Sequence, residues 1–439
     1  MNFKKFIELA KENGISESEL TYSKSSKLSM SLFHGELDNY TVSTTSSLVA
    51  RGIYKGQMGF ASSEKLDSTS FGDLVSQIKD SAAVLEKDEK PLMFKGSKRY
   101  HKKNVYSVAL QNWDTNTKLD LLHKLEDTLK GLDPRVTEVQ VQYTDVDSES
   151  AFVNSYGLNL KNKSNYFYFY ADVLVKDGDD TKSYGDIFLD NDPAKFDLES
   201  FAKSIVEGAI SLLHGAPVGK AHKTKVVFNQ DTVSSLVNAL LGNLSAEEVQ
   251  KHTSLFEGKL NQDVLSKKIT IEEKPLEKNC FFQYFDDEGV ACVNKKVISR
   301  GKLLTYFYNL ETAAKDGVDP TGNAARMGGK MGISFNNIVM KPGKLSEEEL
   351  FAKVKDGVYI TELNGLHAGL DATSGDFSLQ SAGYLIKDGK KAGPLALFTI
   401  AGNLFKVFND VIAVGNNSKL TLSSTNVPSI AVKNLKISG

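Results

Sequence analysis

Residues 165–175 read NYFYFYADVLV, and this stretch decides the fold of the first half of the chain. Aromatic and β-branched residues fill most of its positions, which is typical of a strand. The residues before it predict three more strands, at 136–145, 149–154 and 158–163. A helical period is expected on either side of this group, at 116–132 and 197–213. The pattern therefore predicts a sheet enclosed by helices.

The same arrangement is predicted nearer the N-terminus. Residues 19–63 are rich in Ser, Thr, Tyr and Val and are interrupted by glycines, which favours antiparallel strands joined by hairpins. Helices are predicted at 1–15 and 70–86, and the polar residues 87–103 are interpreted as a loop. The order helix, strands, helix occurs twice, which suggests a duplicated unit, although no sequence repeat supports it.

Residues 215–219, GAPVG, are interpreted as a domain boundary. A strand at 224–228 and a helix follow it, and from about residue 268 strands and glycine turns predominate. We therefore predict an α+β protein of two domains. Residues 1–215 are expected to form a mixed α/β, sandwich-like domain, and residues 216–439 a β-rich domain.

The composition is that of a folded soluble protein, with 41% hydrophobic and 25% charged residues. Lys and Arg total 53 against 55 Asp and Glu, which leaves a formal net charge of −2. Nucleic-acid binding usually requires a basic excess, so no nucleic-acid partner is expected, although a local basic patch is compatible with this sum.

The expected compartment is the cytoplasm. Only two cysteines occur, Cys280 and Cys292, which favours a reducing environment. The first residues carry lysines at positions where a signal peptide would be apolar, and they have the period of an amphipathic helix. No apolar run of about 18 residues exists, so no membrane association is expected.

No catalytic centre is evident from the residues alone. A zinc hydrolase typically carries His-Glu followed by a second His one turn later. None of the seven histidines is followed by Glu, and no two lie within one helical turn. Nucleophile elbows, P-loops and dinucleotide fingerprints are also absent from the sequence.

Weaker constellations have simpler explanations. Glu248 and His252 stand four residues apart, and an exposed helix pair is favoured over a shared metal. His367, between Gly365 and Gly369, is interpreted as a turn residue rather than a base or ligand. The acids at 286–288 are interpreted as a solvated turn before a glycine, with a calcium site as the alternative.

An ordered set of motifs extends through the chain. They are MGFAS at 58–62, FDDEGV at 285–290, GKLLTYFY at 301–308, Thr312-Ala313, PTGNAAR at 320–326, TSGDFS at 373–378, IAGNL at 400–404 and VGN at 414–416. In this order and spacing they resemble the PmbA/TldD family over nearly the whole chain. Considered alone, the Gly-Asn and Gly-Asp pairs would supply only turns with positive φ.

The resemblance implies one of two branches. TldD-type chains carry a His-Glu-x-x-x-His helix and a later Cys that resemble a zinc site, whereas PmbA (TldE)-type chains lack these ligands. Here the aligned positions hold Asn238, Ala239 and Asn243, and residues 418–439 contain no Cys. Asn is a poor zinc ligand and Ala cannot act as a general base. The chain therefore resembles the PmbA branch, with a degenerate site and no catalytic residue of its own.

This resemblance implies a non-catalytic subunit of a cytoplasmic peptidase complex, with zinc expected only in a TldD-like partner. The residues expected to border a shared peptide channel are Thr321, Asn323, Arg326, Gly375, Asp376 and Phe377. Arg326 would pair with a peptide carboxylate or, equally, close a structural salt bridge. The alternatives are a non-catalytic homodimer that binds peptides or partners, and a metalloenzyme that uses Glu248, His252 and His367.

Overall fold

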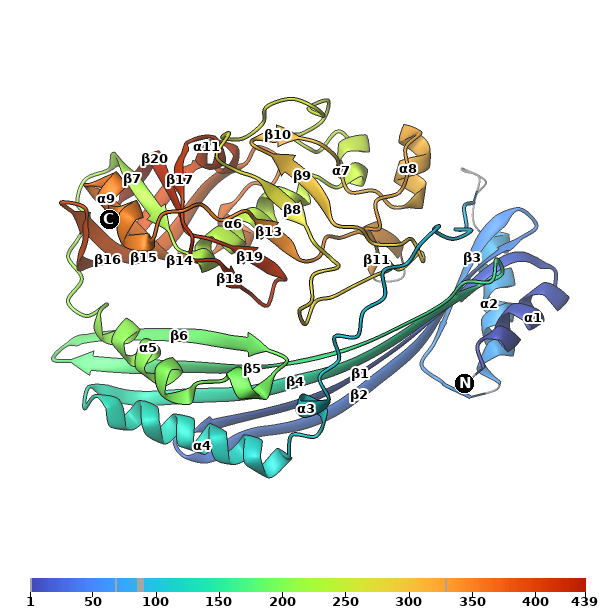
Figure 1. The fold of residues 1–439 in the computed structure, drawn as a ribbon, viewed down its shortest axis with the longest axis horizontal. Coiled ribbons are helices and arrows are strands. Elements are labelled where there is room, and N and C mark those ends of the chain that lie inside the picture. The colour runs from blue at the N-terminus through green and yellow to red at the C-terminus, as the bar shows by residue number, and fades with distance from the viewer. Residues whose placement is uncertain (1, 68, 85–90, 328–329) are drawn as a thin grey trace.

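The computed structural model describes residues 2–67, 69–84, 91–327 and 330–439. Its first half contains one antiparallel sheet of six strands in the order β3-β2-β1-β4-β5-β6. The strands are β1 (Ile15–Phe33), β2 (Glu36–Tyr54), β3 (Gln57–Ser63), β4 (Val136–Asn154), β5 (Asn159–Asp177) and β6 (Asp180–Asp190). Figure 1 shows this sheet as a long, curved layer beneath the second half of the chain.

Helices cover the side of this sheet that faces away from the second half. They are α1 (Lys4–Glu12), α2 (Ser70–Val84), α3 (Val108–Gln111), α4 (Thr115–Leu132) and α5 (Leu198–Ile210), with a 3₁₀ turn, η1 (Pro193–Lys195). Leu20 packs against α1 and α2, and Met30 and Leu32 pack against α4 and α5. Because successive strand residues point to opposite faces, the neighbours Glu19 and Thr21 point toward the second half of the chain.

The sequence prediction was wrong about the lengths of two strands. β4 and β5 are each continuous over 19 residues, where two shorter strands were predicted for each. The polar segment around Asp147 suggested a break, but it pairs without interruption with Ser26 on β1 and Asn165 on β5. β6, which is mostly polar, was not predicted. Pairing with long neighbours overrides local composition in both cases.

The second half contains two further six-stranded sheets and a hairpin. One sheet has the order β16-β15-β14-β7-β20-β17 and the other β10-β9-β8-β13-β19-β18, while β11 and β12 form the hairpin. The strands are β7 (His222–Phe228), β8 (Ile271–Glu273), β9 (Lys295–Ser299), β10 (Lys302–Leu303), β11 (Ala324–Met327), β12 (Lys330–Ile333), β13 (Ile338–Met340), β14 (Gly357–Asn364), β15 (Asp376–Lys387), β16 (Lys390–Asn403), β17 (Val411–Val414), β18 (Lys419–Leu420), β19 (Thr425–Val427) and β20 (Ile430–Ser438).

One helix connects these two sheets. The helices of this half are α6 (Gln230–Gly242), α7 (Ala246–Gln250), α8 (Leu310–Asp316), α9 (Glu347–Val354), α10 (Leu366–Gly369) and α11 (Leu404–Asn409). α6 packs against β14 of one sheet and β19 of the other. Most of its apolar residues, among them Val233, Leu236 and Leu240, are fully buried in the largest core of the molecule. The period of 3.6 residues that predicted this helix is the period of its buried face.

The predicted α+β class is confirmed. The helices predicted at 1–15, 70–86, 116–132 and 197–213 correspond to α1, α2, α4 and α5. Residues 85–86 of the second predicted helix and residues 87–90 of the predicted loop lie outside the described residues. We propose the domain boundary at residues 215–216, between α5 and β7. No helix in the described residues is long and apolar enough to cross a membrane.

Candidate functional site

The helix α6 and the residue after it hold Asn238, Ala239 and Asn243, the three positions that the sequence predicted as a degenerate zinc motif. It begins at Asn229, whose side chain accepts a hydrogen bond of 2.9 Å from the backbone N–H of Thr232. Asn238 is half-buried, and its Nδ2 donates to Ser423 Oγ at 3.0 Å. Ala239 packs against the apolar core. Asn243 is buried just after the helix, where its backbone carbonyl accepts from Ser254 Oγ at 2.5 Å and its side-chain Oδ1 accepts from the backbone N–H of Leu255 at 3.5 Å.

These side chains do not fit a zinc ion. Zinc in proteins takes three or four ligands from His, Cys and carboxylates. The Asn238 amide is committed to a hydroxyl, and Asn243 completes a turn. Throughout the described part of the chain, no three His, Cys, Asp or Glu side chains come together as a metal-binding group. Glu248 bonds to Thr253 and His252 to Glu257, so these two residues face different partners.

Hydroxyl groups gather beside α6 instead. Ser234 Oγ lies 2.6 Å from Thr425 Oγ1, 3.1 Å from Ser423 Oγ and 3.2 Å from Thr421 Oγ1. Ser234 and Thr425 are almost completely buried. This cluster links the middle of α6 to residues 421–425, because Asn238 also bonds to Ser423. Mutual hydrogen bonding satisfies these buried hydroxyls and holds the segment against the helix.

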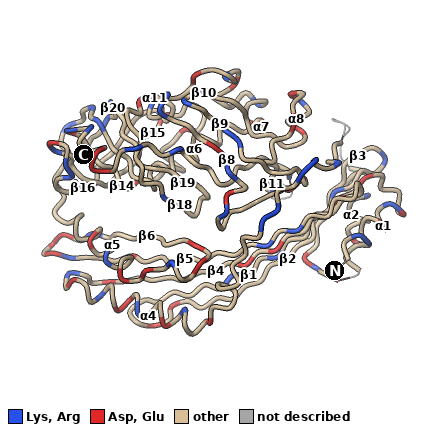
Figure 2. Tube along the Cα trace, viewed as in Figure 1, with Lys and Arg blue, Asp and Glu red and all other residues tan. Residues whose placement is uncertain are grey.

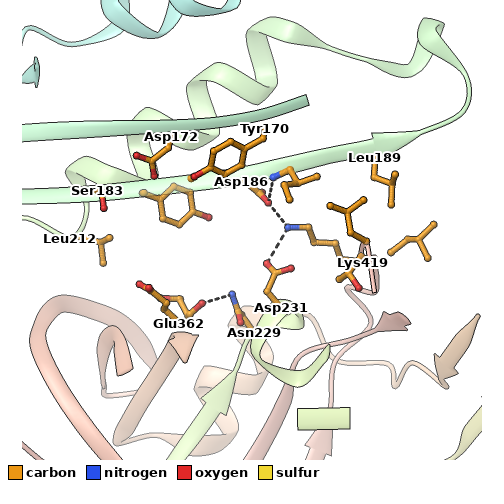
Figure 3. Close-up of a pocket in the computed structure, with 17 residues that line it drawn as sticks. Tyr170, Asp172, Ser183, Asp186, Leu189, Leu212, Asn229, Asp231, Glu362 and Lys419 are labelled. Carbon is orange, nitrogen blue, oxygen red and sulfur yellow. Dashed lines mark hydrogen bonds and ion pairs between the residues drawn. The ribbon is translucent and has the colours of Figure 1, made fainter. Parts of the chain in front are cut away.

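A cavity of about 390 Å³ lies beside this cluster, between the first sheet and the second half of the chain. Tyr170 and Asp172 on β5, together with β6, form one wall. The opposite wall comes from the start of α6, from Glu362 on β14 and from residues 419–422. Figure 3 shows side chains from both walls pointing into the space between the two layers. The cavity is therefore formed by two parts of the chain that are far apart in sequence.

Lys419 spans the two walls. Its Nζ contacts Asp186 on the sheet at 2.6 Å and Asp231 on α6 at 3.0 Å, as Figure 3 shows. Burial lowers the pKa of Lys419, but the two carboxylates outweigh burial, so the pKa is raised overall. Lys419 therefore stays charged and links the walls at this end of the cavity.

Two further carboxylates give the cavity an acidic character. Burial, and then the charge of Glu362, raises the pKa of Asp172. Neither Asp172 nor Glu362 forms an ion pair with a described residue. The cavity therefore has apolar and aromatic walls together with carboxylates, a combination that suits a peptide better than an anionic ligand. Sequence reasoning missed it, although Asp172 is a single acid in the apolar run 171–175 and could have been a signal.

The motif residues Thr321 and Asn323 contact each other away from this cavity, and Arg326 has separate partners. Asn323 is buried, and its Nδ2 donates to Glu273 Oε1 at 2.7 Å. Thr321 Oγ1 donates to Asn323 Oδ1 at 2.7 Å. Arg326 reaches the first sheet, where its Nη2 lies 3.1 Å from Glu19 Oε1. A hollow of about 290 Å³ lies beside Asn323. In this structure Arg326 forms the salt bridge that the sequence left as one of two alternatives.

Two of the three acids at 286–288 are buried and Asp287 is half-buried, so the prediction of a solvated turn was wrong. Asp286 is 1% exposed and Glu288 3% exposed. Asp286 accepts hydrogen bonds from the backbone N–H groups of Glu288, Val290 and Ala324. Burial, with the Glu288 carboxylate second, raises the pKa of Asp286 well above its ordinary value. The segment turns as predicted, with Gly289 at a φ of 80°, but it turns at the interface between the two halves.

Gly375, Asp376 and Phe377 hold a different turn. The carbonyl of Gly375 accepts from the backbone N–H of Leu404 at 2.7 Å, and Asp376 Oδ1 accepts from Asn403 Nδ2 at 2.9 Å. Phe377 is buried in the core. Their contacts connect β15 to α11, whereas those of Thr321 and Asn323 connect residues 308, 273 and 334. Described contacts do not join the two groups of motif residues into one site.

Comparison with known proteins gives matches over most of the chain. Three models of the PmbA/TldA metallopeptidase family match: domain 1 at residues 18–83, the central domain at 109–213 and the C-terminal domain at 221–439. A metalloprotease of Methanothermobacter thermautotrophicus is 28% identical, over 65% of this chain and 64% of that protein. A zinc metalloprotease TldD homologue of Saccharolobus solfataricus is 23% identical, over 99% of both chains.

Two solved structures have the same fold. A protein of Thermotoga maritima, described as a putative modulator of a DNA gyrase, is 29% identical, with a TM-score of 0.92 over 99% of both chains. TldE of Thermococcus kodakarensis is 21% identical, with a TM-score of 0.92 over the whole of both chains.

Proposed function

This chain belongs to the PmbA/TldD metallopeptidase family, and from that premise we propose that it is a PmbA/TldE-like subunit of a peptidase complex. The subunit provides part of a peptide-binding cavity, and a TldD-like partner provides the zinc. The complex degrades or trims peptides, and this chain contributes no catalytic group. We propose the cytoplasm as its location, which two buried free thiols support.

The observation that carries this proposal is the chemistry of α6. Where a TldD-type chain would carry ligands and a general base, Asn238 bonds to Ser423, Ala239 packs in the core, and Asn243 caps the helix. All three side chains have structural partners, and none offers a lone pair that binds zinc well. The helix serves as a scaffold in this proposal. A subunit that provides part of a shared peptide-binding cavity still needs the helix to position the residues around it.

The cavity beside α6 is the part of this chain that we propose as a peptide site. One wall is formed by β5 and β6 and the other by the start of α6, β14 and residues 419–422, and the lining combines tyrosines, aliphatic side chains and carboxylates. β6 is an edge strand of the first sheet, and an extended peptide can pair with such an edge through backbone hydrogen bonds, which are independent of sequence. Cleavage by the complex would then tolerate many sequences. Thr321, Asn323, Arg326, Gly375, Asp376 and Phe377 do not line this cavity, and we propose that they stabilise their own turns and contacts without acting chemically.

The test is reconstitution. The tagged chain is purified from its native host, its stoichiometric partners are identified, and zinc content and peptide hydrolysis are measured for the chain alone and for the pair. We expect a co-purifying relative with His-Glu-x-x-x-His, zinc in the pair only, and hydrolysis by the pair only. Stoichiometric zinc and hydrolysis in the pure chain would disprove the proposal.

A pair of variants tests the role of the cavity itself. Ser183→Trp places a large ring on the cavity wall, whereas Ser204→Trp places the same ring on the exposed face of α5. We expect the first variant to assemble normally but to lower peptide hydrolysis by about tenfold or more, because it fills the binding volume. The second variant should behave as wild type. Equal hydrolysis by both variants would exclude the cavity from the peptide path.

The second candidate function is a homodimer that binds peptides or partners without cleaving them. The absence of fitting zinc ligands on α6 supports it as well, since it requires no catalytic partner. Recovery of this chain alone, as a homodimer, would favour it. The same purification therefore separates the two candidates.

A further inference from the structure

A strongly basic strap crosses the molecule where its two halves meet. We call residues 95–103, KGSKRYHKK, the basic strap. They contain five Lys or Arg, one His and no acid, in a chain whose formal net charge is −2. Figure 1 shows the strap leading toward α3 across the front of the molecule, and Figure 2 shows its blue cationic positions along that path. The neutral overall composition conceals this concentration of charge.

The strap is held in one place by side-chain hydrogen bonds to the second half of the chain. Tyr100 donates from its hydroxyl to the carbonyl of Gly289 at 2.6 Å, and Ser97 Oγ accepts from the backbone N–H of Ala291 at 2.9 Å. Lys103 Nζ donates to the carbonyl of Leu276 at 3.0 Å. These contacts fix an extended segment against the interface, so ligand binding would require little further ordering.

The cationic side chains of the strap are exposed, and most of them have no bonding partner among the described residues. Lys95 lies over the ring of Tyr156, at 5.6 Å from its centroid, and Lys103 is bonded to a carbonyl. Lys98, Arg99 and Lys102 are exposed and form no ion pair or hydrogen bond with any residue that the structure describes. A row of fixed, unpaired positive charges raises the local concentration of anionic partners.

The backbone of the strap is also largely unpaired, since the N–H of Ser97, which donates to the Tyr100 hydroxyl at 3.1 Å, is the one strap backbone group bonded to a described residue. Residues 95–103 belong to no helix or strand, and within the described part of the chain they form no backbone–backbone hydrogen bond. An extended backbone with free N–H and C=O groups can pair with a second extended chain, and the side chains then select its sequence. Here the side chains would select carboxylates.

We propose that the basic strap is a docking site for an extended acidic segment of another protein. A polypeptide fits better than a nucleic acid for two reasons. The aromatic ring within the strap is Tyr100, which packs edge-on against Tyr284 and has its hydroxyl engaged, so it cannot stack on a base. Three unpaired cations are also few compared with the roughly six to ten phosphate contacts of typical DNA-binding proteins. The proposal is independent of the proposed subunit function.

The test uses fluorescence anisotropy on the full chain with a labelled peptide of about ten residues rich in Glu. The same peptide with Gln in place of Glu, and single-stranded DNA of equal charge, serve as comparison probes. The triple variant Lys98→Gln, Arg99→Gln, Lys102→Gln removes the free charges of the strap. Its matched control is Lys203→Gln, Lys267→Gln, Lys268→Gln, which removes three exposed lysines elsewhere.

We expect the acidic peptide to bind at low salt, and to bind about tenfold or more weakly at about 0.5 M salt because the contacts are exposed. The strap variant should weaken binding by about tenfold or more, and the control by less than about twofold. Three results would each overturn the proposal. They are no binding to the wild-type chain, equal binding by the strap variant, and tighter binding of the DNA than of the peptide.

Discussion

Glu19 and Arg326 form an ion pair of 3.1 Å although 307 residues separate them in the chain. Glu19 lies on β1 and is completely buried, and its Oε1 also accepts from Arg51 at 2.7 Å. Arg51 also forms an ion pair with Glu288, with 3.2 Å between Nη1 and Oε1. The four charges connect the first sheet to the second half of the chain. Arg326, predicted as a possible ligand for peptide carboxylates, instead contacts a carboxylate of its own chain.

Replacement of Glu19 with Gln should therefore destabilise the protein strongly. The substitution leaves Arg326 without its carboxylate and Arg51 with one in place of two, inside a buried interface. We expect the free energy of unfolding to fall by about 3 kcal/mol, which is typical for breaking a buried ion pair. Urea unfolding measures it. Glu138→Gln, at an exposed position on β4, is the control and should change stability by less than about 0.5 kcal/mol. Similar values for the two variants would show that the buried network is dispensable.

A glycine in the first motif explains how α2 reaches the sheet. A Cβ at Gly59 would lie 1.9 Å from the carbonyl oxygen of Ile78, so only glycine allows this approach. We expect Gly59→Ala to lower the free energy of unfolding by about 2–3 kcal/mol through overpacking. Gly72, within α2 itself, has no atom near its Cβ position, and Gly72→Ala should raise stability by about 0.5–1 kcal/mol. Thermal unfolding of both variants checks the opposite signs, and a loss of stability in both would contradict the explanation.

The sequence predicted the helices better than the strands and the site. α6 has a continuous apolar face, so its period alone marks it. β4 contains polar residues around Asp147, and only its pairing with β1 and β5 shows that the strand continues. The cavity requires Asp172, Glu362 and Lys419 to meet. Local sequence patterns do not predict which distant residues line the same cavity, because the topology of the sheets brings these residues together. The ordered motifs identified the family, but their residues are spread over strands such as β3, β11 and β16 and the turns beside them, and they do not converge on one site.

Asp286 should make stability depend on pH. Its pKa is raised in the folded protein because it is buried and lies near Glu288. Between its ordinary pKa of about 4 and the raised value, the folded state retains a proton that the unfolded state releases. Stability contributed by this group therefore falls as the pH rises through that window. Asp286→Asn removes the titration and keeps an acceptor for Glu288 and Val290.

Unfolding free energies of wild type and Asp286→Asn, measured in urea from about pH 4 to pH 8, test this effect. We expect the difference between them to shift in favour of the Asn variant as the pH rises. Titrating groups that do not interact with Asp286 are common to both proteins and cancel in the difference. A difference that is constant with pH would show that Asp286 ionises equally in the folded and unfolded states.

Lys419 should hold the two walls of the cavity together. It contacts Asp186 on β6 and Asp231 on α6, and its side chain is 29% exposed. Lys419→Met keeps the length of the side chain but leaves two carboxylates facing each other across the gap. Because all three groups are partly exposed, we expect a loss of only about 1–2 kcal/mol, which should shrink at high salt.

Lys195→Met is the matched control for Lys419→Met, because the exposed Lys195 pairs at 3.0 Å with Asp190, only five residues away in the chain. It should cost less than about 0.5 kcal/mol. In the reconstituted complex, Lys419→Met should also raise KM for peptides, since a wider gap positions the substrate less well. A loss of stability without any change in KM would assign Lys419 to folding alone. A change in KM without loss of stability would show that Lys419 contacts the peptide directly.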